Sequence, residues 1–288
     1  MPKKRQTNSV PVPVENSRGN GETERSKPFV KWAGGKRQLL SEILHHVPER
    51  FGTYHEPFVG GGAVFFALPQ GTVARLSDSN ERLVRAYRGV KFHVEDVIAK
   101  LKEFKQDKDT YLVQRDRNID ADSDADVAAW FIYLNKMGYN GLYRVNSQNL
   151  FNVPLGERTS RINICDPDNL RACARALAKA TIVHQDFQHA LRLVKRGDLV
   201  YLDPPYIPVS ATSYFTSYTV DGFTNDDQIR LRDAALALKT KGAHVIVSNS
   251  SAAAALYQDG FKIIKVFAAR NVNSKGDRRG KIAELLIT

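Results

Sequence analysis

The chain has 288 residues, 42% of them hydrophobic and 25% charged, which is enough for one large domain or for a core with an inserted domain. No run approaches the roughly 20 apolar residues of a membrane span, and the start lacks the apolar stretch of a secretory signal, so we expect a cytoplasmic protein. The formal net charge of +11 predicts a polyanionic partner.

The two cysteines, Cys165 and Cys173, have no histidine or further cysteine beside them at the spacing of metal ligands. They predict neither a disulfide framework nor a zinc site. We therefore expect two ordinary thiols and no bound metal.

The first residues are typical of a disordered basic tail. Residues 1–27 are rich in Lys, Arg, Asn, Ser and Pro and hold few apolar side chains that could be buried.

From Pro28 to residue 80, apolar runs alternate with helical patterns. The expected elements are a helix over 36–46, a strand over 54–56, a helix over 63–68 and a strand over 73–76.

The middle of the chain changes character, because residues 81–178 are mainly helical and charged by pattern. Alternation resumes afterwards. Expected there are strands over 181–184, 199–202 and 244–248, a helix over 226–239, and an antiparallel hairpin of 262–268 with 282–287. Strands that alternate with helices predict the α/β class, with a doubly wound mixed sheet. We expect one domain from residues 28–80 and 179–288, split by an inserted domain of residues 81–178.

The most informative stretch is residues 203–206 (DPPY), directly after the apolar run at 199–202 (LVYL). The run predicts a buried strand, and its end is rigid because proline fixes φ and lacks a backbone N–H. The Asp203 carboxylate and the Pro204 carbonyl can each accept one N–H of an exocyclic amine, while Tyr206 stacks on the ring that carries the amine. The alternative is an ordinary Pro-rich turn with a capping Asp.

A second group of residues predicts a cofactor site. Residues 56–62 (EPFVGGG) follow the first predicted strand, and glycines there let the backbone approach a ligand closely. Asp78 ends the next strand, where the acid of a nucleotide-binding fold holds ribose hydroxyls. A dinucleotide would place its pyrophosphate at the glycine turn, but Glu56 repels phosphate and suits a cation. The pattern therefore favours S-adenosyl-methionine, with its sulfonium and ammonium groups, over NAD.

Residues 31–36 (KWAGGK) look superficially like a phosphate loop. Val30 stands where that motif needs its first glycine, and Arg37 replaces its Ser or Thr, so we exclude a phosphate loop. Trp32 can lie beside the adenosyl-methionine with some cation–π contribution, and Lys36 can reach the cofactor or a DNA phosphate. The alternatives are a core Trp and a lysine at the start of a helix.

Six motifs follow one another in a characteristic order: KWAGGK at 31–36, EPFVGGG at 56–62, SDSN at 77–80, GYNGL at 138–142 with Arg144, FNVP at 151–154 and DPPY at 203–206. In these motifs the chain resembles the DNA adenine methylases of the Dam type, over residues 28–288. The resemblance implies an adenosyl-methionine-dependent methyltransferase fold with a target-recognition insertion, and methyl transfer to adenine N6 in duplex DNA. The cofactor contacts that it implies are Trp32, Lys36, Asp78 and Asp203, with others around Phe58 and Gly60.

The resemblance also implies where DNA is contacted. Tyr139 and Asn140 would approach or enter the base stack at the site that the target base vacates, and Arg144 would read a guanine in the major groove. The family prototype targets GATC, and we expect the same target here. The residues at 136–137 (KM) and 147–148 (SQ) depart from the family pattern and leave the target open.

Other assignments stay open at this point. The same pair of acceptors suits an N4-cytosine or an RNA-adenine methyltransferase. A catalytically silent DNA-binding regulator is a further alternative, although every group that the chemistry needs is present. Arg270 and the basic segment 275–281 are candidates for the DNA-facing surface, each with a solvated surface charge as its alternative. We expect a monomer with no obligatory protein partner.

Overall fold

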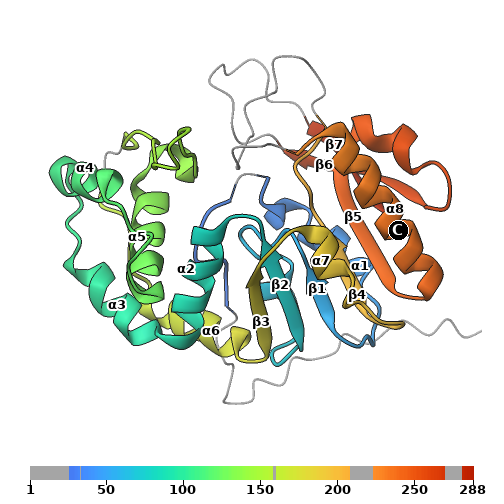
Figure 1. Cartoon of the computed structure of the whole chain (residues 1–288), viewed down its shortest axis with the longest axis horizontal. Coiled ribbons are helices and arrows are strands. Elements are labelled where there is room, and N and C mark those ends of the chain that lie inside the picture. The colour runs from blue at the N-terminus through green and yellow to red at the C-terminus, as the bar shows by residue number, and fades with distance from the viewer. Residues whose placement is uncertain (1–25, 33, 158–159, 208–222, 270–280) are drawn as a thin grey trace, which may run out of the picture.

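A mixed β-sheet runs through the fold in the order β3-β2-β1-β4-β5-β7-β6 (Figure 1). The computed structural model describes residues 26–32, 34–157, 160–207, 223–269 and 281–288. The strands are β1 (Tyr54–Glu56), β2 (Ala74–Asp78), β3 (Ala180–His184), β4 (Leu199–Leu202), β5 (His244–Ser250), β6 (Ile263–Ala269) and β7 (Lys281–Ile287). The first five are parallel, whereas β7 is antiparallel to both of its neighbours. The mixed sheet and the late antiparallel hairpin are as predicted.

The strand order reverses between β1 and β4, which pair with each other although they are far apart in the sequence. All four residues of β4 are buried, as expected for a parallel strand that is covered on both faces. In open α/β sheets, ligands bind outside the carboxyl ends of the strands at such a switch point. The DPPY motif follows β4 directly, so the topology places it there.

Helices flank the sheet, and several of those between β2 and β3 lie to one side of it (Figure 1). The helices are α1 (Leu40–His45), α2 (Glu81–Phe92), α3 (Val94–Glu103), α4 (Lys108–Asp116), α5 (Asp124–Met137), α6 (Pro167–Leu177), α7 (Phe187–Leu191) and α8 (Asn225–Lys241). Side-chain caps set several of their starts. The Asn80 side chain accepts from the Leu83 amide at 3.0 Å at the start of α2, and Thr224 forms a capping box at the start of α8. None of the described helices has the length and apolar character that crossing a membrane requires.

Two sequence-predicted helices near the amino terminus differ from the structure. The helix expected over 63–68 was wrong, because only the short 3-10 helix η2 (Phe65–Ala67) forms there. Leu68 is extended (φ −70°, ψ 162°), as expected for a residue that precedes a proline. The helix expected over 36–46 forms in two pieces, η1 (Lys36–Gln38) and α1, because Leu39 (φ −102°, ψ 2°) leaves the helical region.

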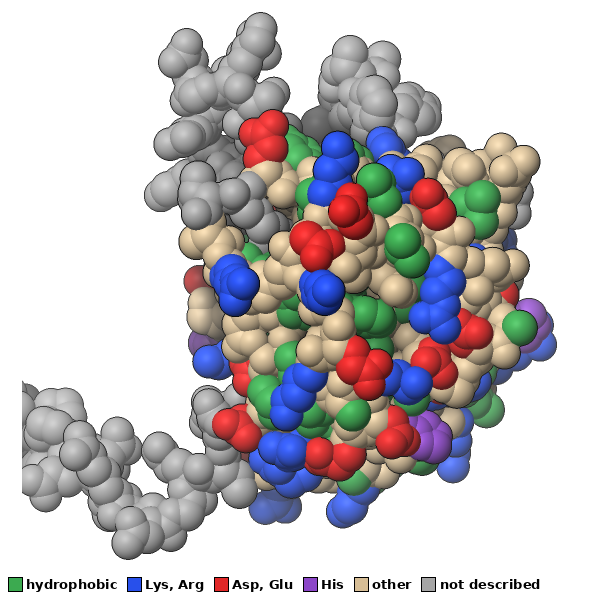
Figure 2. All heavy atoms as spheres, turned by 90° about the vertical axis from the view of Figure 1, so that its left-hand side faces the viewer, with side chains coloured by type: hydrophobic (Ala, Val, Ile, Leu, Met, Phe, Trp, Pro, Cys, Tyr) green, Lys and Arg blue, Asp and Glu red, His purple; other side chains and the backbone are tan. Residues whose placement is uncertain are grey.

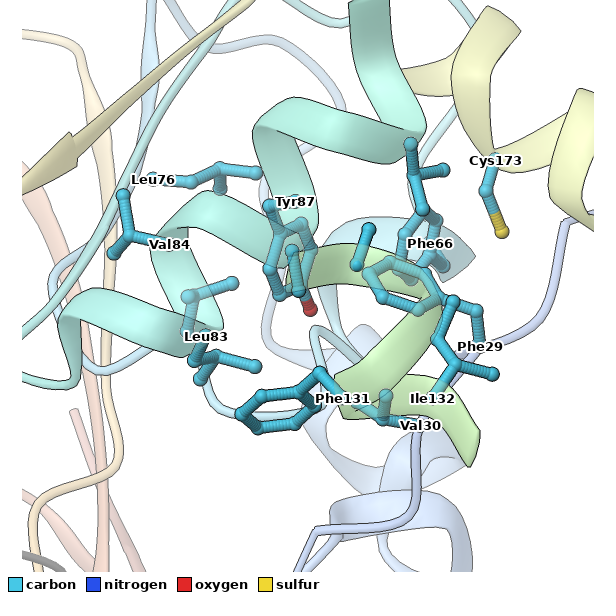
Figure 3. Close-up of a cluster of buried hydrophobic side chains, with 14 of the residues drawn as sticks. Phe29, Val30, Phe66, Leu76, Leu83, Val84, Tyr87, Phe131, Ile132 and Cys173 are labelled. Atoms are coloured by element: carbon cyan, nitrogen blue, oxygen red, sulfur yellow. The ribbon is translucent and has the colours of Figure 1, made fainter. Parts of the chain in front are cut away.

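One hydrophobic cluster contains residues from both the sheet and the helices between β2 and β3. Figure 3 shows Leu76 of β2, Tyr87 of α2 and Phe131 of α5 within this cluster. Phe29, from the segment before η1, packs edge-on against Tyr87 with ring centroids 4.9 Å apart. Helices α2 and α5 are therefore fixed to the sheet by shared apolar packing as well as by the chain connections.

The start of the described chain is also tied down. The Lys27 amide donates to the Asn169 side chain at 2.8 Å, and the Asn169 side-chain amide donates back to the Lys27 carbonyl at 3.0 Å. Lys27 was assigned to the polar tail, so hydrogen-bonded structure begins at least one residue earlier than expected. The rest of the predicted tail, residues 1–25, lies outside the described residues.

Candidate active site

A cavity of about 900 Å³ lies where the sheet topology predicts a ligand site. It brings together every residue that the sequence assigned to catalysis or to the cofactor. These residues are Trp32, Lys36, Glu56, Phe58, Gly60, Asp78, Asp203, Pro204 and Tyr206. They come from segments far apart in the sequence, so the shared cavity supports a single site.

The glycine turn after β1 forms one wall of this cavity. Gly60 (φ +46°) and Gly62 (φ +66°) adopt the left-handed conformation that favours glycine. A Cβ at Gly60 would lie only 2.6 Å from the Trp32 Cδ1 atom, so the indole packs directly on the backbone. The Tyr87 hydroxyl donates to the Gly60 carbonyl at 3.0 Å. The turn therefore owes its shape to the missing side chains and to this buried hydroxyl.

Trp32 continues the wall toward the insertion. Its ring stacks on Phe131 and on Tyr143, with centroid distances of 6.2 and 6.0 Å. The side chain is half-buried and lines the cavity, so it is both a packing residue and a surface for a ligand.

Asp78, at the end of β2, holds the glycine turn in place. Its carboxylate accepts hydrogen bonds from the Gly60 amide and from the Asn80 amide, each at 3.0 Å. Burial raises the pKa of Asp78, and the two amides partly oppose that rise because they stabilise the ionised form. Each carboxylate oxygen has a further lone pair, which is compatible with the expected contact to ribose hydroxyls.

Glu56 is the residue whose surroundings most clearly favour a cationic ligand. Its side chain is only 2% exposed, and Oε2 has no hydrogen-bond partner among the described residues. Burial raises its pKa well above the usual value, as do the nearby Asp203 and Asp78 carboxylates, whereas interactions with the Tyr54 side chain and the Phe65 backbone oppose that rise. A buried unsatisfied carboxylate oxygen is costly, and an ammonium or sulfonium ligand would relieve that cost. This buried carboxylate therefore fits the positively charged S-adenosyl-methionine and disfavours a negatively charged pyrophosphate.

Asp203 follows β4 and pairs with a buried lysine. The Lys36 Nζ atom lies 3.0 Å from Asp203 Oδ1, and the lysine side chain is only 4% exposed. Lys36 Nζ also donates to the Gly34 carbonyl at 2.5 Å and lies 4.7 Å from the centroid of the Tyr206 ring. Burial raises the pKa of Asp203 to about 6, and Lys36 partly opposes the rise.

The rest of the DPPY motif is fixed by side chains from α8 and β5. The Gln228 side-chain amide donates to the Pro205 carbonyl at 2.7 Å, and Asn249 donates to Gln228 at 3.1 Å. Pro204 lines the cavity, and the hydrogen bonds of the described residues include none to its carbonyl. One carboxylate and one carbonyl oxygen are thus presented on a rigid backbone.

Some residues of the cavity escaped sequence analysis. His184, which ends β3, lines the cavity together with Gln185 and Asp186, and the ring of Phe187 stacks on Phe58 at 5.4 Å. The signal that could have found them was the position of this segment after a predicted strand of the same parallel sheet.

The residues expected to contact DNA lie apart from the cavity, in the segment after α5. Tyr139 is 47% exposed, Asn140 takes a left-handed backbone (φ 53°), and both belong to the 3-10 helix η3 (Tyr139–Gly141). Arg144 is also exposed, and its Nε atom donates to the Asn152 Oδ1 atom at 2.7 Å. Arg270 lies outside the described residues.

The same holds for most of the basic segment 275–281. It lies outside the described residues, except that Lys281 begins β7. Nothing in the structure therefore tests its expected place on the DNA-facing surface. Among the described residues, no cluster of His, Cys, Asp and Glu could hold a metal ion.

Comparison with known proteins gives one consistent result. The family model described as D12 class N6 adenine-specific DNA methyltransferase matches residues 32–272. A Type II methyltransferase of Lactococcus lactis subsp. cremoris is 44% identical over 273 residues, covering 91% of this chain and 95% of that protein. A Type II methyltransferase of Methanocaldococcus jannaschii is 42% identical over 285 residues, covering 91% of this chain and 98% of that protein.

A DNA adenine methylase of Vibrio cholerae is 33% identical over 270 residues, covering 91% of this chain and 96% of that protein. These matches favour adenine in DNA over the cytosine and RNA alternatives, and an enzyme over a silent regulator. The chain therefore belongs to the D12 class of N6 adenine-specific DNA methyltransferases, enzymes whose methyl donor is S-adenosyl-methionine.

Proposed function

We propose that the protein methylates N6 of an adenine that has been swung out of duplex DNA, with GATC as its target. One observation carries the proposal: Asp203 and Pro204 line the same cavity as the glycine turn. A methyl donor and an exocyclic amine can therefore meet in that cavity. The buried, unsatisfied Glu56 carboxylate supports a cationic donor on the glycine-turn side.

The residues of the cavity divide into two groups by chemistry. Those that would hold the cofactor are Trp32, Lys36, Glu56, Phe58, Gly60 and Asp78, joined by Asp203 at the boundary. The bound cofactor supplies an electrophilic methyl group on a sulfonium. Asp203 would accept one N6 hydrogen and stabilise the positive charge that develops on the nitrogen, and the Pro204 carbonyl would accept the other hydrogen. Catalysis then rests on positioning and electrostatics.

The target nitrogen lies inside the duplex, so the base has to be extruded, at a cost of a few kcal/mol. Stacking on Tyr206 recovers part of that cost, because a base–aromatic stack contributes about 1–3 kcal/mol. Tyr139, exposed at the start of η3, would fill the gap that the base leaves.

We propose residues 81–178 as the target-recognition domain. The charges on its surface indicate which part of it faces DNA. Figure 2 shows one side of the molecule, on which basic and acidic side chains are intermixed rather than sorted into a single basic patch. Several basic side chains of this region are paired with acids, as in Arg171–Glu95 at 2.7 Å and Lys100–Asp126 at 2.6 Å. A paired surface attracts phosphates weakly. This supports a DNA face on the segment after α5 instead.

That segment is joined to the cofactor side through one buried amide. The Asn135 side chain donates to the Lys31 carbonyl at 2.9 Å and to the Gly141 carbonyl at 2.8 Å, and it accepts from the Lys31 amide at 2.7 Å. Lys31 begins the motif that carries Trp32 and Lys36, so the DNA-contacting turn and the cofactor-contacting loop are held in one fixed relation.

Methyl transfer should depend on the ionisation of Asp203. Since the pKa of this group is raised to about 6 by burial, we expect kcat/KM to fall as the pH drops through about 6, where the carboxylate becomes protonated. The measurement is kcat/KM on a duplex oligonucleotide from pH 5 to pH 8. The Asp203→Asn variant should show residual activity without this step, and a parent profile that is flat across pH 6 would contradict the assigned role.

Arg144 should carry specificity at one base pair. Its guanidinium is exposed but braced by Asn152, which suits bidentate contact with a guanine. We expect Arg144→Ala to lose about 1–3 kcal/mol of discrimination at one position of the target. The measurement is kcat/KM on the target duplex and on duplexes with single base-pair changes. Arg175→Ala, which removes an exposed arginine on α6, is the charge-matched control. Equal losses on every duplex would contradict base reading by Arg144.

The proposed target can be tested in cells. DNA from cells that express the protein is digested with one endonuclease that GATC methylation blocks and one that requires it. We expect resistance to the first and cleavage by the second. Cleavage only by the first enzyme, together with N6-methyladenine in the same DNA, would keep the reaction and reject the sequence.

A further inference from the structure

Lys36 contacts the two groups that are assigned above to the target base. Its ammonium lies 3.0 Å from the Asp203 carboxylate and 4.7 Å from the centroid of the Tyr206 ring. An exocyclic amine held by Asp203 above Tyr206 would need much the same position. The ammonium therefore has to give up at least part of its contact with Asp203 when the base arrives.

A second anion stands within reach of the same ammonium. Glu284, on β7, places Oε2 at 3.9 Å from Lys36 Nζ, and its side chain is only 19% exposed. The same Oε2 accepts a hydrogen bond from the Tyr206 hydroxyl at 2.6 Å. Glu284 thus lies close to both Lys36 and Tyr206, although it does not line the cavity itself.

The position of Glu284 is set by the sheet. It pairs in register with Ser250 of β5, and the Ser250 hydroxyl donates to the Ile207 carbonyl, directly after the DPPY motif. On its other side Glu284 pairs with Val266 of β6. The carboxylate is therefore fixed relative to Tyr206 by the antiparallel end of the sheet, rather than by a loop.

We propose that Glu284 is a positioning residue for methyl transfer: it receives the Lys36 ammonium when the base amine takes its place on Asp203, and it holds the Tyr206 ring through its hydroxyl. This inference rests on the proposed function. A buried ammonium is costly without a counter-charge, so Lys36 can leave Asp203 only if another anion is close. Glu284 supplies that anion with a movement of about 1 Å, the difference between 3.9 Å and a close ion pair.

The test is a double-mutant cycle on the full-length protein. Glu284→Gln keeps an acceptor for the Tyr206 hydroxyl but removes the charge. Single-turnover methyl transfer is measured at saturating S-adenosyl-methionine and duplex DNA, in the parent and in a Lys36→Met background. We expect Glu284→Gln to slow the parent about tenfold and to have little effect in the Lys36→Met background, because the two residues act as a unit.

Two controls separate this role from a structural one. Glu95→Gln removes a surface acid that is paired with Arg171 and should leave the rate unchanged. Thermal unfolding and the DNA dissociation constant are measured for each variant and should match the parent. If Glu284→Gln does not fold, the cycle is run with Glu284→Asp, which keeps the charge but draws it back from Lys36 by one methylene; we then expect a smaller slowing that again requires Lys36.

Equal slowing by Glu284→Gln in the parent and in the Lys36→Met background would overturn the inference. So would a Glu284→Gln single variant that transfers the methyl group at the rate of the parent. Either result leaves the proposed function standing, provided that the parent forms N6-methyladenine. Absence of that product from the parent would instead reject the proposed function itself.

Discussion

Replacing Asp203 with alanine is expected to slow methyl transfer by roughly 10²–10³-fold or more, while duplex DNA still binds, because a preorganised charged group is lost from the reacting centre. The carboxylate is the only acid on the DPPY motif, and it stands at the rigid end of a fully buried strand. The residues expected to contact DNA lie in a different segment, so binding should largely survive. Single-turnover rates and the DNA dissociation constant measure the two effects separately.

The charge and the fold both need controls in this experiment. Alanine at position 203 removes both the shape and the charge that face the buried Lys36 ammonium, whereas Asp203→Asn keeps the shape and removes only the charge, so it is measured in parallel. Asp168→Ala removes an acid whose side chain is 80% exposed on α6 and should leave the rate unchanged. Methyl transfer at the parental rate by folded Asp203→Ala or Asp203→Asn protein would remove Asp203 from the reaction.

Replacing Gly60 with alanine is expected to weaken cofactor binding by roughly 5- to 150-fold, the range of a lost contact of about 1–3 kcal/mol. The new Cβ would lie 2.6 Å from Trp32 Cδ1, so the indole must move within the cavity that it lines. The positive φ at this position adds roughly 1–2 kcal/mol of strain for a residue with a side chain. Isothermal titration with S-adenosyl-methionine gives the affinity, and thermal unfolding gives the stability.

Gly197 offers a matched control for the strain. It has φ +82°, and a Cβ there would meet nothing within 4 Å. Gly197→Ala should therefore lower the stability in a similar way and leave the affinity for the cofactor unchanged. If both variants bind the cofactor as the parent does, then the contact of Trp32 with the glycine turn does not shape the cofactor site.

The sequence predicted the site more completely than it predicted the helices around it. β4 and the DPPY motif could be located because a run of apolar β-formers that ends in two prolines has few alternatives. Glu56, Asp78 and Asp203 were brought together by a general rule, since the ends of parallel strands meet at one edge of the sheet. That rule needed no knowledge of side-chain contacts.

What escaped prediction depends on tertiary contacts. No local pattern shows that Glu284 of β7 reaches Tyr206, because 77 residues lie between them and only the sheet register joins them. The sequence predicted a helix over 63–68, longer than the 3-10 helix η2 that forms there. The apolar pattern of this segment favours a helix, but the proline that follows Leu68 ends it early. Lys36 was predicted as a ligand contact, but its ion pair with Asp203 could not be seen from their spacing.

The central claim is that an acid and a neighbouring carbonyl hold the amine of an extruded adenine beside the methyl donor. The most direct test is a structure of the protein with a target duplex and a non-reactive analogue of S-adenosyl-methionine. The account predicts the target adenine outside the helix, with N6 at hydrogen-bond distance, about 2.7–3.2 Å, from both an Asp203 carboxylate oxygen and the Pro204 carbonyl. An adenine that stays paired in the duplex, or one whose N6 faces away from Asp203, would contradict it.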